Sequence, residues 1–146
     1  MIRVLVVDDS PSFVSFIQEV LNNEEDIQVV GVAKHGMQAV SLAKKLNPDV
    51  ITMDILMPQL DGVEAIRHIM AKHPTRIIVL SALVDEKRAG KVFTALANGA
   101  LEALDKNFAE DGIVVQEKVD ALVECVRPCA KIRVIIHSLM NVENTL

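Results

Sequence analysis

Three carboxylates, a hydroxyl and an amine stand directly after short apolar runs of this 146-residue chain. They belong to Asp8, Asp9, Asp54, Ser81 and Lys106. Clustered carboxylates repel one another, so a site that keeps three of them ionised needs a cation. Oxygen ligands suit Mg²⁺, which keeps several waters that a phosphorylated ligand can replace. In such a site Asp54 would be a nucleophile toward phosphorus, while Lys106 and Ser81 would bind phosphoryl oxygens.

Each of these residues also has a plainer explanation. Asp8 and Asp9 could be acids favoured by the dipole at a helix N-terminus. Ser81 could be an ordinary loop hydroxyl, and Lys106 a surface charge. Asp54 alone could be a solvated acid at the end of a strand. Their occurrence at the ends of four different apolar runs favours a shared site over four unrelated explanations.

Five apolar runs alternate with helical patterns and must position these residues. The runs predict strands at Ile2 to Val7, Ile27 to Ala33, Val50 to Met53, Ile77 to Leu80 and Ala100 to Leu104. Fully apolar strands that alternate with helices are typical of a parallel sheet covered on both faces. The carboxyl ends of such strands lie at one edge, where α/β proteins bind ligands. The sequence therefore predicts an α/β fold that brings the five residues together.

Capping and breaking residues delimit the helices. Ser10 is a natural N-cap and Pro11 suits the first helical position, where its missing N–H costs nothing. Pro74 ends a helix and Gly99 caps another. The predicted helices run from Pro11 to about Asn23, Gly36 to Leu46, Asp61 to Lys72, Asp85 to Ala97, and from Ile113 or Val114 to Val126. Beyond Pro128, Ile132 to Ile136 is either a further strand or a continuation of the last helix.

Composition narrows the class of protein. A net charge of −5 and a pI near 5.3 argue against a direct nucleic-acid or acidic-membrane surface. No apolar run approaches the ~20 residues of a membrane-spanning helix, and the N-terminus lacks the regions of a signal peptide. We therefore expect a cytoplasmic protein. Cys125 and Cys129 have no nearby histidine or cysteine cluster and are interpreted as reduced packing residues.

The ordered motifs resemble the receiver domain of bacterial two-component response regulators. They are Val-Asp-Asp-Ser at 7 to 10, Asp54 with Met57-Pro58 and Asp61-Gly62, Ser81-Ala82, Gly99-Ala100, and Lys106. The resemblance covers residues 1–127, which we expect to form the receiver, and leaves residues 128–146 as a tail or the start of a linker. It implies a doubly wound, five-stranded parallel sheet in the flavodoxin-like order 2-1-3-4-5.

The resemblance also implies roles for the clustered residues. Asp54 would accept a phosphoryl group from the phosphohistidine of a sensor histidine kinase, assisted by Ser81 and Lys106. Asp9, Asp54 and the backbone carbonyl of Leu56 would bind Mg²⁺ directly, whereas Asp8 would act mostly through water. Residues 85–104 would switch an effector domain or a partner protein. Nothing in the sequence decides between a monomer and a homodimer.

Within this family the chain is most similar to chemotaxis protein-glutamate methylesterases, which join a receiver to a C-terminal hydrolase domain. The similar segments are Ile-Arg-Val-Leu-Val-Val-Asp-Asp-Ser-Pro, Leu-Asn-Pro-Asp-Val-Ile-Thr-Met-Asp-Ile-Leu-Met-Pro and Val-Leu-Ser-Ala-Leu. The chain has no Gly-x-Ser-x-Gly motif, so we expect it not to be an enzyme by itself. It is then either the regulatory half of a methylesterase or a single-domain regulator.

Two positions depart from the family pattern. Receivers usually carry an aromatic ring three residues before the lysine, where this chain has Ala103, so the usual hydroxyl-aromatic coupling is in doubt. A proline, often after a cis bond, usually follows the lysine, where this chain has Asn107. A non-proline cis bond costs ~3 kcal/mol, so we expect either a trans bond or retained strain. We further hypothesise that Leu56 and Leu83 hinder water and prolong the phosphorylated state.

Two other functions stay open at this point. A pseudo-receiver that only binds partners is suggested by Ala103 and Asn107. Haloacid-dehalogenase-like phosphatases also use an aspartate nucleophile and Mg²⁺ on an α/β sheet, but they usually show an Asp-x-Asp pair after the first strand. The adjacent Asp8 and Asp9 do not have that spacing, so the receiver is the favoured interpretation.

Overall fold

The structure, a computed structural model of the chain, describes residues 1–57, 59–82 and 86–134. One parallel sheet has the strand order β2-β1-β3-β4-β5. Its strands are β1 (Ile2–Val7), β2 (Ile27–Ala33), β3 (Val50–Met53), β4 (Arg76–Ser81) and β5 (Glu102–Asp105). The predicted doubly wound fold and its strand order are therefore confirmed, with shifts of one or two residues at some strand ends.

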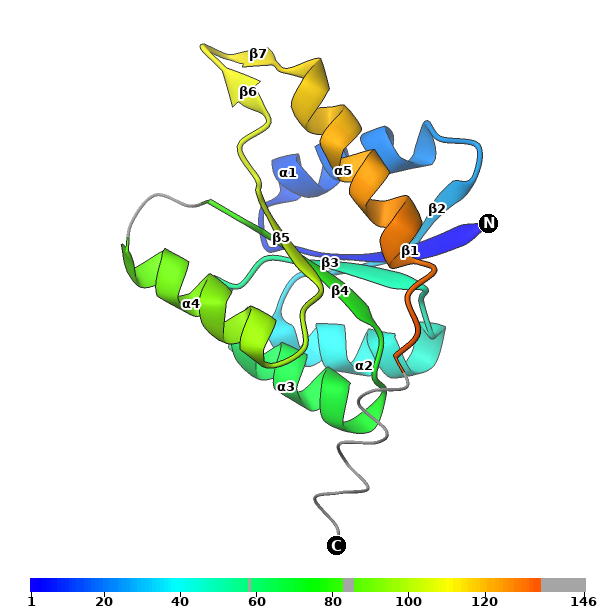
Figure 1. Cartoon of the computed structure of the whole chain (residues 1–146), viewed down its shortest axis with the longest axis vertical. Helices are drawn as coiled ribbons and strands as arrows, with labels where there is room; N and C mark the ends of the chain where they lie inside the picture. Colours follow the sequence, from blue (N-terminus) through cyan, green and yellow to red (C-terminus); the bar gives the residue numbers. More distant parts are fainter. Residues whose placement is uncertain (58, 83–85, 135–146) are drawn as a thin grey trace, which may run out of the picture.

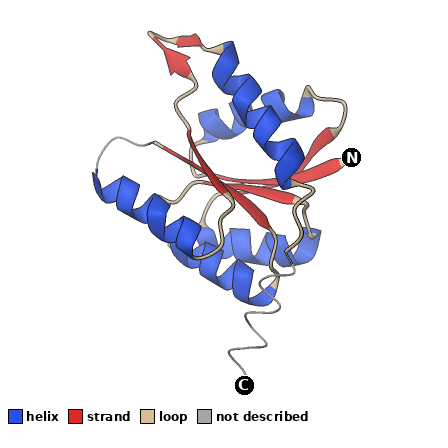
Figure 2. Ribbon diagram, viewed as in Figure 1, coloured by secondary structure: helices blue, strands red, loops and turns tan. Residues whose placement is uncertain are grey.

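Helices cover both faces of the sheet, as Figures 1 and 2 show. One face carries α1 (Pro11–Asn22) and α5 (Gln116–Cys129), and the other carries α2 (Gly36–Leu46), α3 (Gly62–Lys72) and α4 (Glu86–Ala97). None of the helices in the described part of the chain has the length and apolar character needed to cross a membrane.

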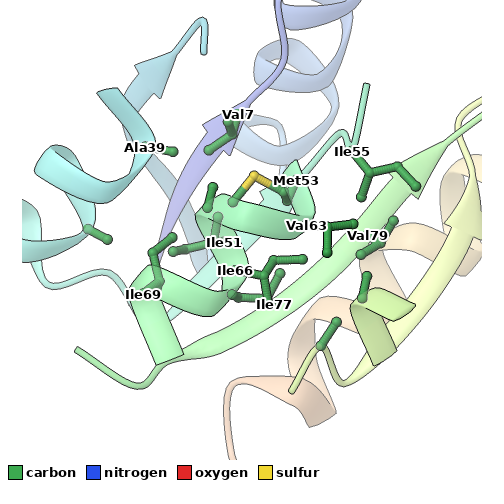
Figure 3. Close-up of a cluster of buried hydrophobic side chains, with 14 of the residues drawn as sticks. Val7, Ala39, Ile51, Met53, Ile55, Val63, Ile66, Ile69, Ile77 and Val79 are labelled. Carbon is green, nitrogen blue, oxygen red and sulfur yellow. The ribbon is translucent and has the colours of Figure 1, made fainter. Parts of the chain in front are cut away.

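Alternating side chains of the strands fill two hydrophobic cores, one on each side of the sheet. Figure 3 shows the core beneath α2 and α3, in which Ile51, Met53 and Ile77 of the sheet meet Ile66 and Ile69 of α3. The opposite core is formed by Val4, Val6, Ile78 and Leu80 with residues of α1 and α5. Burial of each such side chain contributes roughly 1.5–3 kcal/mol to the free energy of unfolding. Packing on both faces of the sheet therefore fixes the carboxyl ends of its strands.

Local chemistry fixes the two helices that begin beside the acidic edge. The Ser10 hydroxyl accepts a hydrogen bond from the Phe13 N–H, and Pro11 occupies the first position of α1, as predicted. Asp61 caps α3 in the same way by accepting from the Glu64 N–H. A side chain at Gly62 would place its Cβ 2.4 Å from the Asp54 carbonyl oxygen. Only glycine therefore lets α3 begin so close to the end of β3.

The predicted start of the last helix at Ile113 or Val114 is wrong. Ile113–Val114 form strand β7, which pairs antiparallel with β6 (Ala109–Glu110) in a small hairpin. Asp111 and Gly112, which join the two strands, have φ values of 51° and 77°. Asp-Gly favours such a two-residue turn with two positive φ angles, whose twist suits a hairpin. Helix α5 consequently begins at Gln116.

The other end of α5 also differs from the prediction. The helix continues past Val126 and includes Pro128 in its last turn, ending at Cys129. Residues 132–134 form neither a strand nor a helix, and the rest of the predicted segment Ile132 to Ile136 lies outside the described residues. A proline is tolerated here because only a hydrogen bond of the final turn is lost.

The two cysteines pack on the α5 side of the sheet. Both are free thiols, their sulfur atoms lie 3.9 Å apart, and both belong to or contact the core formed with α1 and α5. Burial raises the pKa of the Cys125 thiol to about 12 and also raises that of Cys129. Both thiols are therefore protonated at neutral pH, which accords with the predicted packing role.

Candidate functional site

The carboxyl ends of the central strands bring the predicted residues to one edge of the sheet. Asp8 follows β1, Asp54 follows β3, Ser81 ends β4 and Lys106 follows β5. Backbone hydrogen bonds continue the ladders into the site, since the Asp54 N–H donates to the Val7 carbonyl at 3.0 Å and the Lys106 N–H to the Ser81 carbonyl at 3.1 Å. The positions of these side chains are thus set by the sheet rather than by long loops.

The three acids form a compact group of oxygen ligands. One carboxylate oxygen from each of Asp8, Asp9 and Asp54 lies within 4.8 Å of the others. Asp8 and Asp54 are buried, whereas Asp9 is exposed. An acidic cluster that is open on one side fits a hard divalent cation, which prefers carboxylate oxygens and retains water. The donor chemistry therefore agrees with a metal of the magnesium type.

Lys106 is the counter-ion of the two buried acids. Its Nζ lies 2.9 Å from Oδ2 of Asp8 and 3.1 Å from Oδ2 of Asp54. Burial, the largest single influence, lowers the pKa of Lys106, but its hydrogen bond to Asp8 and the charge of Asp54 together outweigh burial and raise the pKa. The amine is therefore charged at neutral pH. The direct contact between Asp8 and Lys106 was not anticipated from the sequence.

Asp54 is held between opposing influences. Burial disfavours its charged form and raises its pKa above the ordinary value, and the negative charge of Asp8 adds to this effect. The Leu56 N–H, which donates to Oδ1 at 3.2 Å, and the Lys106 ammonium act in the opposite direction. A carboxylate that is buried yet paired is weakly solvated, so its oxygens are available to an incoming electrophile.

Ser81 supplies an unused hydrogen-bonding group at the same edge. Its hydroxyl oxygen is buried and has no hydrogen-bond partner among the described residues. Buried polar atoms without a partner are rare in proteins, and such an atom is accounted for by an ordered water, an ion or a ligand. Ser81 ends β4, the strand that pairs with β3, so its hydroxyl is a candidate partner for a group bound at Asp54.

The predicted metal ligand Leu56 lies in the loop after Asp54, where its N–H contacts the Asp54 carboxylate. The role of its carbonyl stays a prediction. Leu83 and Pro58, which the sequence also singles out, lie outside the described residues. The hypothesis that two leucines flank the site therefore has a structural placement only for Leu56.

The segment after Lys106 achieves its course without a cis bond. The Lys106–Asn107 bond is trans, because the described residues contain no cis peptide. The Asp105 side chain accepts from the Asn107 N–H at 3.0 Å, and the Asn107 side chain accepts from the Ala109 N–H at 3.3 Å. These successive side-chain turns take the place of a proline in shaping the segment. Ala103 packs against the core on the α3 and α4 side.

One neighbour of the site was missed from the sequence. The ammonium of Lys106 lies 4.6 Å from the centroid of the Phe13 ring, which α1 presents toward β5. Phe13 falls within the helix predicted from Pro11 to about Asn23. That prediction contained no information about which charged group the ring would meet.

Comparison with known proteins places the chain in a family. A model of the response regulator receiver domain matches residues 4–117. A protein-glutamate methylesterase/protein-glutamine glutaminase of Carboxydothermus hydrogenoformans is 41% identical over 93% of this chain and 38% of the relative. That of Thermotoga maritima is 42% identical over 87% of this chain and 37% of the relative. The chain thus spans well under half the length of these relatives.

A solved structure agrees with the sequence comparison. The crystal structure of the response regulator domain of Thermotoga maritima CheB superposes with a TM-score of 0.81 at 41% identity, covering 91% of this chain and 98% of that one. The receiver domain of a NarL response regulator from Mycobacterium tuberculosis is 31% identical, with a TM-score of 0.71 over 86% of this chain and 96% of that one.

Proposed function

Because the chain belongs to the response regulator receiver domain family, we propose that Asp54 accepts a phosphoryl group from the phosphohistidine of a sensor histidine kinase. One observation carries the assignment to Asp54. Its buried carboxylate lies 3.1 Å from the Lys106 ammonium and within the acidic cluster, and it follows β3, the strand next to the one that ends in the unpartnered Ser81 hydroxyl. Asp8 shares the lysine and the cluster, but it follows β1, which is not adjacent to β4.

The transfer follows from the chemistry of these groups. An Asp54 oxygen attacks phosphorus, the new O–P bond forms as the P–N bond to the donor imidazole breaks, and the electron pair of that bond leaves with the imidazole. Lys106, already 3.1 Å from Asp54, binds a phosphoryl oxygen as negative charge is transferred to the site. The Ser81 hydroxyl donates to another phosphoryl oxygen and so gains the partner that it lacks.

The acidic cluster would hold Mg²⁺ during this reaction. Asp9, Asp54 and the Leu56 carbonyl would be its direct protein ligands, and Asp8 would act mostly through water. The bound ion would neutralise the acids and draw charge from the phosphoryl oxygens. Asp8, which is hydrogen-bonded to Lys106, would at the same time keep the lysine oriented.

We place the output surface at residues 85–104, which include α4 and β5. Helix α4 exposes two large apolar residues, Phe93 and Leu96, which are 74% and 40% solvent-accessible. Lys91 of α4 lies 3.5 Å from the Asp61 carboxylate, which caps α3 beside the site. This contact joins α4 to the start of α3, where Gly62 packs against the Asp54 backbone, and it does not need a ring at position 103.

The relatives suggest what this surface would regulate. We propose that residues 1–127 form the receiver of a cytoplasmic chemotaxis regulator, that residues 128–146 belong to a tail or linker, and that the receiver controls a protein-glutamate methylesterase domain. Esterase activity itself would reside in that effector domain, since the receiver carries no hydrolase motif.

Intact mass spectrometry tests the phosphoacceptor proposal. The chain and its Asp54→Ala variant would be incubated with acetyl phosphate, with Mg²⁺ or with EDTA. We expect the mass of one phosphoryl group on the wild-type chain with Mg²⁺ only, and none on the variant. Failure of the wild-type chain to gain mass under any condition would contradict the proposal and favour a receiver that acts only by binding.

A further inference from the structure

An aromatic cluster lies against the lysine of the site. The ring centroids of Phe13 and Phe108 are 6.1 Å apart, those of Phe16 and Phe108 5.6 Å, and those of Phe13 and Phe16 6.3 Å. Of these rings, Phe13 has the Lys106 ammonium over its face, 4.6 Å from the centroid. The aromatic rings and Lys106 border a cavity of about 280 Å³.

We propose that Phe13 is a positioning residue for phosphoryl transfer, which holds the Lys106 ammonium beside Asp54 through a cation–π contact. The inference rests on the proposed function, because it assigns Phe13 a part in the same reaction. It adds a residue of α1 that the sequence motifs of the site do not include.

The need for such a residue follows from the nature of lysine. Its ammonium is a compact charge on a flexible four-carbon stem, so it can bind acids from many positions. Asp8 and Asp54 both contact it with one oxygen, and these two contacts do not define the direction of the stem. The Phe13 ring adds a third contact. The negative face of the ring attracts the ammonium and excludes water from that direction.

Phe13 is itself held in place by the segment that carries the lysine. Phe108 follows Lys106 by two residues and is 6% exposed, and its side chain belongs to the core between the sheet, α1 and α5. Contact between Phe13 and Phe108 therefore ties α1 to the segment after β5. The lysine and the ring keep their relative position because Phe13 packs on Phe108, which belongs to the same segment as Lys106.

The ammonium can serve a phosphoryl group without leaving the ring. It already lies 3.1 Å from the Asp54 carboxylate while it contacts Phe13. A phosphoryl group attached to Asp54 would therefore be bound next to the ammonium. The ring thus holds the ammonium where negative charge develops on the phosphoryl oxygens. The lysine does not have to be ordered during the reaction.

Three variants separate the aromatic face from simple packing. Phe13→Tyr keeps a ring, Phe13→Leu keeps an apolar side chain without one, and Phe16→Leu makes the same change at a ring of the cluster that does not meet Lys106. With acetyl phosphate and saturating Mg²⁺, we expect Phe13→Leu to be phosphorylated about fivefold more slowly. Phe13→Tyr and Phe16→Leu should remain within about twofold of the wild-type rate.

A direct measurement on the unphosphorylated chain accompanies the rates. Ring currents should shift the ε-methylene protons of Lys106 upfield in the NMR spectrum of the wild-type chain and Phe13→Tyr. This shift should disappear in Phe13→Leu. Unfolding by urea, followed in parallel, verifies that each variant is folded, and Phe13→Met replaces Phe13→Leu if the leucine variant is not.

The outcomes distinguish the two proposals. A wild-type chain that takes no phosphoryl group contradicts the phosphoacceptor function itself. Two results would overturn only the role of Phe13, provided that the wild-type chain is phosphorylated. Either Phe13→Leu reacts as fast as the wild-type chain, or Phe16→Leu reacts as slowly as Phe13→Leu. In a Lys106→Met background, Phe13→Leu should cause no further loss, because the ring acts through the lysine. If Phe13→Leu still slowed phosphorylation about fivefold in the Lys106→Met background, the role of Phe13 would also be overturned.

Discussion

The Lys106 ammonium lies 3.1 Å from the Asp54 carboxylate, although the two residues come from different strands and are far apart in the chain. This contact joins the proposed phosphoacceptor, Asp54, to the cation that would bind the phosphoryl oxygens. Lys106 also pairs with Asp8, so the one ammonium serves two buried acids. Lys106 therefore neutralises buried negative charge in the unphosphorylated chain as well.

Replacement of Lys106 should destabilise the chain when no divalent ion is present. Lys106→Met leaves Asp8 and Asp54 buried without a counter-ion, and we expect a loss of about 1–2 kcal/mol in unfolding free energy at pH 7 in EDTA. Because the folded-state pKa of Lys106 is raised, this stabilisation is present at neutral pH. It is lost only as the pH rises above the ordinary value of 10.5 and through the folded-state value.

Urea unfolding measures this effect, and Mg²⁺ should restore part of the loss because it neutralises the same acids. Lys118→Met is the matched control, since Lys118 pairs at 3.5 Å with the exposed Glu110. That variant should change the unfolding free energy by less than about 0.5 kcal/mol. Equal effects of the two substitutions would show that Lys106 is not the counter-ion of the buried acids.

The Asp54 carboxyl should titrate above the ordinary aspartate pKa of 3.8, because burial disfavours its charged form. The native state then binds more protons than the unfolded state between 3.8 and the raised pKa, so the contribution of Asp54 to stability falls as the pH rises through this window. A carbon-13 NMR titration of the Asp54 carboxyl in EDTA measures the shift. A midpoint at or below 3.8 would contradict the assigned balance of burial and pairing.

Loss of the Ser81 hydroxyl should affect the reaction but not the fold. The hydroxyl has no partner among the described residues, so Ser81→Ala removes a buried polar atom without breaking a hydrogen bond, and the unfolding free energy should stay equal or rise slightly. Phosphorylation by acetyl phosphate should slow by about tenfold, since one donor to the phosphoryl oxygens is lost. Ser81→Thr, which keeps the hydroxyl, should retain most of the rate. A wild-type rate for Ser81→Ala would remove Ser81 from the site.

The leucine hypothesis predicts the lifetime of the phosphorylated state. If apolar bulk at Leu56 and Leu83 hinders an in-line water, replacement of both by glutamine should shorten the half-life several-fold, because a glutamine side chain can orient the attacking water. The half-life is read from the decay of the phosphorylated mass after the donor is removed. Gln59→Leu, in the same loop as Leu56, is the control. An unchanged half-life of the double variant would refute the hypothesis.

The residues of the site were predictable because strand ends carry them. Asp54 and Ser81 each follow an apolar run, and parallel topology brings such ends to one edge without any knowledge of side-chain contacts. The capping residues Ser10 and Asp61 likewise act within one helical turn, so their roles are visible locally. The order of the strands came from the resemblance to a family rather than from periodicity.

The features that the sequence did not predict arise where two local signals compete, or where residues far apart in the chain come into contact. Ile113 and Val114 fit a helical face, but the Asp-Gly turn before them favours a hairpin, and that signal was present in the sequence. The extension of α5 through Pro128 reflects packing of Cys129 in the core, which outweighs one lost hydrogen bond. The meeting of Phe13 with Lys106 requires the direction of both side chains, which spacing within one helix does not determine.

The most direct test of the account locates the phosphoryl group. The chain, phosphorylated by acetyl phosphate with Mg²⁺, would be reduced with borohydride, which converts an aspartyl phosphate to homoserine, and its peptides sequenced by mass spectrometry. We expect homoserine at position 54 and unchanged aspartate at Asp8 and Asp9. Modification at another residue, or a phosphorylated chain with no homoserine at position 54, would contradict the claim that Asp54 is the phosphoacceptor.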